Sequence, residues 1–127
     1  MNFDSYEHKF QNYINSKFRI LQNMQSSDTF IYCSDDQVLI DEIGKRKILA
    51  EKVAFTVTDD TTKQAYLKED TIYVNLLEKD IFSVSVGEIQ LRGKHNYGNS
   101  MAAMLAARAV DIKNDKIRES LISFQNV

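Results

Sequence analysis

Two asparagines three residues apart, Asn96 and Asn99, are the first candidates for chemistry in this 127-residue sequence. Each carboxamide carries both a donor and an acceptor, so a pair on one side of a helix could read the edge of an adenine ring. A helix N-terminus nearby would also favour a bound anion. The plainer interpretation is that either asparagine caps a helix over residues 100–110. His95 precedes the pair in a stretch, 93–96, that we expect to be a loop.

Lys17 is the second candidate, because it interrupts an apolar helical stripe between Tyr13 and Ile20. The common explanation is a lysine whose stem packs on the protein while its ammonium reaches water. The alternative is a partly desolvated amine with a lowered pKa. Such an amine can react with carbon dioxide to give a carbamate, which is an anion able to bind magnesium.

Two pairs of adjacent carboxylates complete the set. Asp35 and Asp36 directly follow an apolar run, and acidic residues at the end of a strand can hold magnesium. Carboxylates also suit the first turn of a helix, and we favour the capping role for this pair. Asp59 and Asp60 are most simply a solvated turn.

Composition excludes several classes of protein. The formal net charge is −2, and no basic patch indicates nucleic acid. No apolar run approaches the ~20 residues that span a membrane, and no signal peptide pattern begins the sequence. Neither GxGxxG nor GxxxxGK[ST] occurs, so the sequence contains no phosphate loop. The single Cys33 is expected to pack as a small hydrophobe, and with only two histidines there is no Cys/His metal cluster or catalytic triad. These features favour a soluble cytoplasmic protein that binds neither nucleic acid nor membrane.

The elements that would position these residues form one α/β domain, in which a mixed sheet with an antiparallel sub-sheet is flanked by helices. Periodicity of three and four predicts helices, and short β-rich runs between turns predict strands. We expect helices over 6–24, 37–43 (closed by Gly44), 100–110 and 115–124 (capped by Asn114). We expect strands over 29–33, 52–57, 64–68, 71–76, 81–86 and 88–91, with a hairpin turn at 69–70. Alanines 102, 103, 106 and 107 are expected to form a small face that permits close packing of their helix.

Three segments, taken together, resemble one family, the D-glutamate-adding Mur ligases. Asp4-Ser5-Tyr6 and the later run Tyr13-Ile14-Asn15-Ser16-Lys17-Phe18-Arg19-Ile20 are similar to a DRY…Y-x-x-x-K-x-R-I stretch. Tyr32-Cys33-Ser34-Asp35-Asp36 resembles a strand that ends in N-x-D-D. Leu91-Arg92-Gly93-Lys94-His95-Asn96-Tyr97-Gly98-Asn99-Ser100-Met101-Ala102-Ala103 resembles L-x-G-x-H-N-x-x-N-x-x-A-A, the most specific of the three. Their order and spacing extend the resemblance over essentially the whole chain.

The resemblance implies a function and a set of site residues. The family uses ATP and Mg²⁺ to join D-glutamate to UDP-N-acetylmuramoyl-L-alanine in peptidoglycan synthesis, through an acyl phosphate that the incoming amine attacks. Lys17 would be the catalytic lysine whose carbamate helps to hold magnesium. Asn96 and Asn99 would contact the adenine part of ATP, with His95 of the same motif in a positioning role. Tyr13 lies one helical turn before Lys17 and would line the substrate pocket.

The sequence also departs from the family pattern. Asn2 stands where the family has a magnesium-binding histidine, Ser5 replaces an arginine, and the family's phosphate loop is missing. We therefore expect residues 1–127 to be part of the central ATP-binding domain, without the first and last domains, and catalytically silent alone. A sheet edge left open would invite self-association. The alternatives are a stand-alone α/β binding or interaction module, and a fragment of another Mur ligase or of a folylpolyglutamate synthetase. The run Lys17-Phe18-Arg19-Ile20 favours the D-glutamate-adding type.

Overall fold

The computed structural model describes residue 9 and residues 24–76, 81–89 and 93–123. Within these ranges the elements follow the order β1, α2, β2, β3, β4, β5, η1, α3, α4. The helix predicted over 6–24 lies almost entirely outside the described residues, so its prediction stays open. A search of the described residues finds no helix that is long and apolar enough to cross a membrane.

A five-stranded sheet with the order β1-β2-β3-β4-β5 forms the centre of the chain. β1 (Thr29–Cys33) and β2 (Glu51–Phe55) are parallel, and α2 (Gln37–Gly44) lies in the connection between them. A parallel pair needs such a crossover, because a tight turn cannot return the chain to the same end of the sheet. The predicted mixed sheet is confirmed.

The antiparallel part of the sheet consists of three short strands. β3 (Ala65–Lys68) joins β2 through a single parallel pair, and it is antiparallel to β4 (Thr71–Val74). β5 (Phe82–Ser85) is antiparallel to β4. The predicted hairpin is confirmed, and its turn residue Glu69 adopts a left-handed backbone with φ of 56°.

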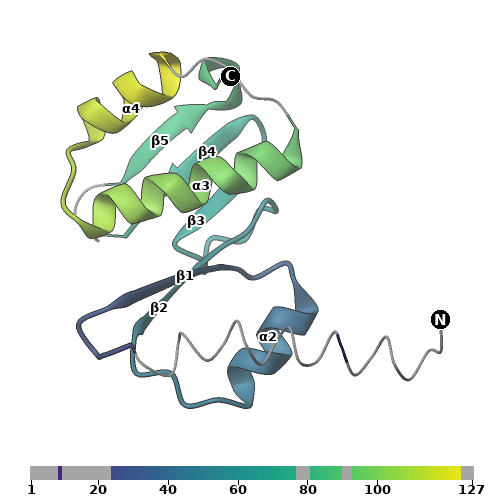
Figure 1. Ribbon diagram of the computed structural model, residues 1–127. Coiled ribbons are helices and arrows are strands. Elements are labelled where there is room, and N and C mark those ends of the chain that lie inside the picture. The colour runs from purple at the N-terminus through teal and green to yellow at the C-terminus, as the bar shows by residue number, and fades with distance from the viewer. Residues whose placement is uncertain (1–8, 10–23, 77–80, 90–92, 124–127) are drawn as a thin grey trace.

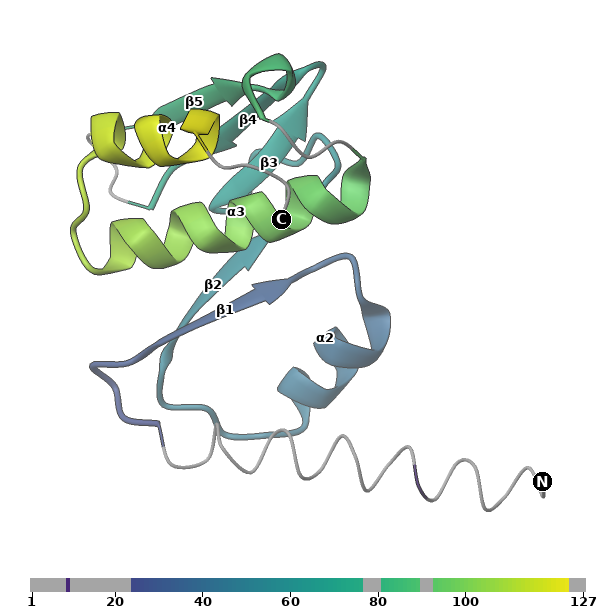
Figure 2. The same cartoon turned by 45° about the horizontal axis from the view of Figure 1, so that its top comes forward.

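Helices pack against both faces of the sheet (Figures 1 and 2). Because side chains alternate along a strand, Ile31 and Val53 face α3 (Lys94–Ala109), while Phe30 faces the side of α2. The larger core lies between α3 and the sheet. Its fully buried members include Val53, Ala65, Ile72, Val74, Val84, Met101, Met104 and Leu105.

The buried face of α3 differs from the predicted one. Met101, Met104 and Leu105 point into the core, whereas Ala103 and Ala106 are exposed. The prediction is confirmed for Ala102 and Ala107, which are partly buried against the core, and wrong for Ala103 and Ala106. Burial of the larger apolar side chains stabilises the helix–sheet contact more, so they decide which face of α3 is buried.

Several element boundaries also differ from the sequence predictions. Residues Val86–Glu88 form a 3₁₀ turn, η1, where the sequence predicted the start of a strand over 88–91. Its cause is local, because the Ser85 and Glu88 side chains bond each other's backbone amides in a capping box. Gly44 is the last residue of α2 and does not lie beyond it, since the cap residue is Lys45 in an ordinary right-handed conformation. Asn114 begins α4 (Asn114–Ser123) rather than preceding it.

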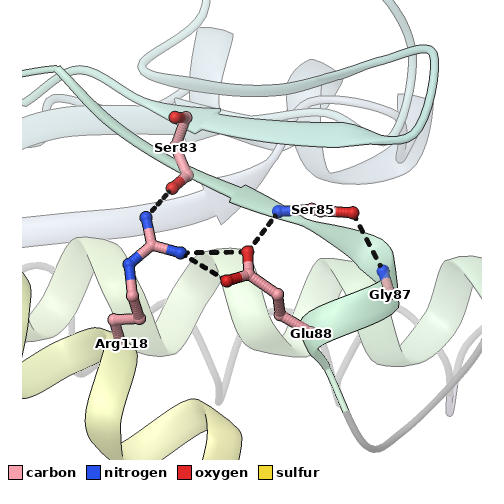
Figure 3. Close-up of polar contacts among 5 residues, drawn as sticks. All are labelled: Ser83, Ser85, Gly87, Glu88 and Arg118. Carbon is pink, nitrogen blue, oxygen red and sulfur yellow. Dashed lines mark hydrogen bonds and ion pairs between the residues drawn. The ribbon is translucent and has the colours of Figure 1, made fainter.

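An ion pair fixes α4 against the edge strand β5 (Figure 3). Arg118 Nη1 donates to both carboxylate oxygens of Glu88, at 2.8 and 2.9 Å, and Nη2 donates to the carbonyl oxygen of Ser83. The guanidinium also lies over the Phe82 ring, 5.1 Å from its centroid. Hydrogen bonds from the Ser85 backbone and then from Arg118 lower the pKa of Glu88 below its usual value.

The opposite edge of the sheet is β1, which pairs only with β2 among the described residues. An unpaired edge of this kind can accept another strand. The open edge and self-association through it stay predictions.

Candidate functional site

The candidate nucleotide-binding residues lie in the first two turns of α3. The helix begins at Lys94, directly after Gly93, which has φ of 98° and ψ of 154° and, lacking a side chain, provides no side-chain cap. His95 and Asn99 are exposed, and Asn99 Nδ2 lies 3.4 Å from His95 Nε2 across one turn. Asn96 lies half-buried three residues before Asn99.

Two predictions about this segment were wrong. Residues 94–96 are helical and not a loop, and neither Asn96 nor Asn99 is the helix cap, because both lie inside α3. A glycine with positive φ ends the preceding segment, so the helix can begin one turn earlier than a capping asparagine would allow. The capping explanation for the two carboxamides is thereby removed.

The first turns of α3 sit at the carboxyl ends of the parallel strands. A Cβ added at Gly98 would lie 3.5 Å from Phe55 Cε2 and 3.8 Å from Val57 Cγ1, which places this turn against the end of β2. Both views show the N-terminal end of α3 on the same side as the end of β1 (Figures 1 and 2). Open α/β sheets bind their ligands outside the carboxyl ends of the strands. The exposed side chains of α3 therefore stand where such a ligand would bind.

The two adjacent carboxylates Asp35 and Asp36 have different roles. Asp36 caps α2, since its Oδ1 accepts from the amides of Val38 and Leu39 at 3.1 and 3.3 Å. Asp35 does not cap the helix. Its Oδ1 accepts from Thr56 Oγ1 at 2.5 Å and its Oδ2 accepts from the Val57 amide at 2.9 Å. The predicted capping role is confirmed for Asp36 and wrong for Asp35, which instead joins the end of β1 to the end of β2.

Ser34 strengthens the same junction. Its amide and its hydroxyl both donate to the carbonyl oxygen of Phe55, at 2.8 and 3.1 Å. The neighbouring Cys33 faces the α3 side, and burial raises the pKa of its thiol. The thiol is therefore neutral near pH 7, as the sequence predicted for a small hydrophobe, and it is a poor nucleophile.

The acidic turn at 59–60 behaves as predicted. Asp60 Oδ1 accepts from the hydroxyl and the amide of Thr62, at 2.6 and 3.0 Å. These hydrogen bonds lower the pKa of Asp60, and Lys63 adds a smaller contribution in the same direction. The turn is internally satisfied.

Lys17 and Tyr13 lie outside the described residues, so their positions stay predictions. Across the described ranges, no group of three or more His, Cys, Asp or Glu side chains is arranged to hold a metal ion.

Comparison with known proteins gives consistent matches. Residues 3–107 match the family described as the Mur ligase middle domain. The UDP-N-acetylmuramoylalanine--D-glutamate ligase of Christiangramia forsetii is 37% identical over 98% of this chain and 28% of its own length. The same-named ligase of Bacteroides fragilis is 36% identical with the same coverage. The chain thus spans less than a third of the length of these curated relatives.

Solved structures agree on the fold. A UDP-N-acetylmuramoyl-L-alanyl-D-glutamate--2,6-diaminopimelate ligase matches with a TM-score of 0.69 and 18% identity, over 93% of this chain and 25% of its own. A UDP-N-acetylmuramate:L-alanyl-gamma-D-glutamyl-meso-diaminopimelate ligase from Neisseria meningitides matches with a TM-score of 0.63 and 23% identity, over 84% of this chain and 32% of its own. At these identities the likeness concerns the fold alone.

Proposed function

Since this chain belongs to the Mur ligase family, we propose that it is part of an ATP-dependent ligase that joins D-glutamate to UDP-N-acetylmuramoyl-L-alanine. The observation that carries the proposal is the 37% identity to a D-glutamate ligase over 98% of the chain. In this proposal residues 1–127 are part of the central ATP-binding domain of a cytoplasmic enzyme of cell-wall synthesis. The other domains of the relatives would bind the remaining parts of the substrates.

The role of α3 in this function is to hold the nucleotide. Asn96 and Asn99 would present donors and acceptors to the adenine edge, and His95 would position Asn99 from one turn earlier. Their placement at the carboxyl end of the sheet, with Asn99 and His95 within 3.4 Å, supports this assignment. ATP, when bound, supplies the phosphoryl group that activates a substrate carboxylate.

The role of Lys17 is to provide a carbamate. Its neutral amine would add to carbon dioxide with formation of an N–C bond and loss of one proton. The resulting anion would share in binding Mg²⁺, for which oxygen ligands are preferred. Tyr13, one helical turn earlier, would line the substrate pocket.

The test is an amino-acid-dependent release of phosphate from ATP, using the full reading frame that encodes this chain. Phosphate release should require UDP-N-acetylmuramoyl-L-alanine and D-glutamate together. Lys17→Ala should remove the activity, whereas Lys9→Ala, a change at an exposed lysine on the same segment, should leave it unchanged. The 127-residue chain alone should be inactive, because it contains no phosphate-loop motif.

Two results would contradict the proposal. Stronger release with L-lysine or diaminopimelate than with D-glutamate would assign the chain to another ligase of the family. Unchanged activity of Lys17→Ala would remove this lysine from the site.

A further inference from the structure

The hydrogen bonds of Asp35 form a chain that continues beyond its direct partners Thr56 and Val57. The Cys33 thiol also lies 3.7 Å from Oδ2. Thr56 is 1% exposed, and its hydroxyl lies 2.5 Å from Asp35 Oδ1 and 2.7 Å from Thr58 Oγ1. A carboxylate only accepts, so Thr56 gives its single hydroxyl proton to Asp35. The Thr58 hydroxyl must then donate to Thr56, and the Thr58 amide donates to the same oxygen at 3.1 Å. One carboxylate thus orders the backbone from residue 56 to residue 58.

This ordered backbone is the surface on which the first turns of α3 rest. Val57, whose amide donates to Asp35, and Phe55 both border Gly98, since a Cβ added there would lie 3.8 and 3.5 Å from their side chains. Gly98 is located between Asn96 and Asn99 in the sequence. A shift of Val57 would therefore move the turn that carries both carboxamides.

We propose that Asp35 is a positioning residue for nucleotide binding, which acts through Val57 and Gly98 on Asn96 and Asn99. This inference rests on the proposed adenine-binding role of the two asparagines. Asp35 touches no substrate in this scheme, and its contribution is to fix the distance between α3 and the end of β2.

The adjacent Asp36 provides a matched control. It is the same residue type, one position along the chain, but within the described ranges its carboxylate accepts only from amides in the first turn of α2. Asp35→Asn leaves one acceptor oxygen for the Thr56 hydroxyl and the Val57 amide, and it places an amide N–H against one of these two donors. Asp36→Asn keeps a good helix cap, because asparagine is as effective there as aspartate.

The experiment measures the affinity of the full protein for ATP by titration, together with its unfolding midpoint. Asp35→Asn should weaken ATP binding about three- to tenfold, the equivalent of one lost hydrogen bond, while Asp36→Asn should change it less than about twofold. Ile117→Val, which trims the core at α4, serves as a destabilised control and should lower the midpoint without weakening ATP binding. An equal loss of ATP affinity in Asp35→Asn and Ile117→Val would mean that Asp35 acts only through the stability of the fold, and it would overturn the proposal.

A second pair of variants tests the same chain if Asp35→Asn fails to fold. Thr56→Val removes the hydroxyl at nearly constant volume, and Thr56→Ser restores it. ATP binding should weaken in the valine variant and recover in the serine variant, and equal affinities in the two would contradict the proposal.

The parent function is checked separately in the same titration. Asn96→Ala and Asn99→Ala should each weaken ATP binding. If they do so and Asp35→Asn does not, only the positioning role fails. If neither asparagine matters, the adenine-binding assignment itself fails.

Discussion

Two glycines at the start of α3, Gly93 and Gly98, should respond to alanine substitution in opposite ways. We expect Gly98→Ala to stabilise the fold and Gly93→Ala to destabilise it, which is the reverse of what steric crowding alone predicts. Gly98 lies close to two side chains, since a new Cβ would lie 3.5 Å from Phe55 and 3.8 Å from Val57. Gly93 is open, with nothing within 4 Å of a new Cβ. Crowding alone therefore predicts that Gly98→Ala is harmful and Gly93→Ala harmless.

The expected magnitudes follow from the backbone. At Gly98 both distances are ordinary van der Waals contacts, and alanine in a helix interior is about 0.5–1 kcal/mol better than glycine. Gly98→Ala should therefore stabilise the fold by that amount. Gly93 has φ of 98° and ψ of 154°, a region nearly restricted to glycine. A side chain there costs roughly 1–3 kcal/mol, so Gly93→Ala should destabilise.

Thermal unfolding followed by circular dichroism measures both changes. With an unfolding entropy of about 2.1 cal/mol/K per residue, 1 kcal/mol corresponds to a shift of about 4 °C in Tm for a chain of 127 residues. We expect Gly98→Ala to raise Tm by about 2–4 °C, and Gly93→Ala to lower it by roughly 4–11 °C. A destabilised Gly98→Ala together with a neutral Gly93→Ala would refute the reasoning, because steric contact and not backbone conformation would then decide.

Two further predictions concern the packing of the sheet. The pKa of Glu88 is lowered in the folded state, first by the Ser85 amide and then by Arg118. The stabilising effect of this carboxylate is therefore present above its unfolded pKa and is lost as pH falls through the lower folded pKa. The urea midpoints measured at pH 7 and below pH 4 should therefore differ less in Glu88→Gln than in the unsubstituted protein. An unchanged difference would show that this carboxylate does not contribute to the pH dependence of stability. Leu105 is fully buried between α3 and the sheet, so Leu105→Ala should cost about 2–5 kcal/mol of unfolding free energy. A loss below about 1 kcal/mol in the same urea assay would contradict the assigned core.

The elements that could be predicted from the sequence are those with local causes. The strand over residues 29–33 is β-branched and aromatic, and the hairpin at 69–70 has polar turn residues between two apolar runs, so short windows suffice. Asp36 likewise caps the helix that directly follows it. Each of these depends on residues within a few positions in the chain.

The features that the sequence did not reveal depend on distant contacts or on backbone conformation. Asp35 accepts from Thr56 and Val57, which are 21 and 22 residues away, and the parallel pairing of β1 with β2 brings these groups together. The start of α3 depends on the positive φ of Gly93, and this φ angle cannot be predicted from the neighbouring residues. A capping asparagine and an asparagine inside a first turn look alike in sequence, because both stand near a predicted helix start.

The central claim, that the first turns of α3 bind the adenine part of ATP, is tested most directly by backbone NMR during a titration with magnesium-ATP. We predict saturable shifts at Asn96 and Asn99, with smaller shifts at Glu51, at the opposite end of β2 from Phe55. Saturation of the binding signal without shifts at either asparagine would contradict the account, since the nucleotide would then bind elsewhere. A complete absence of shifts would equally contradict it for this chain.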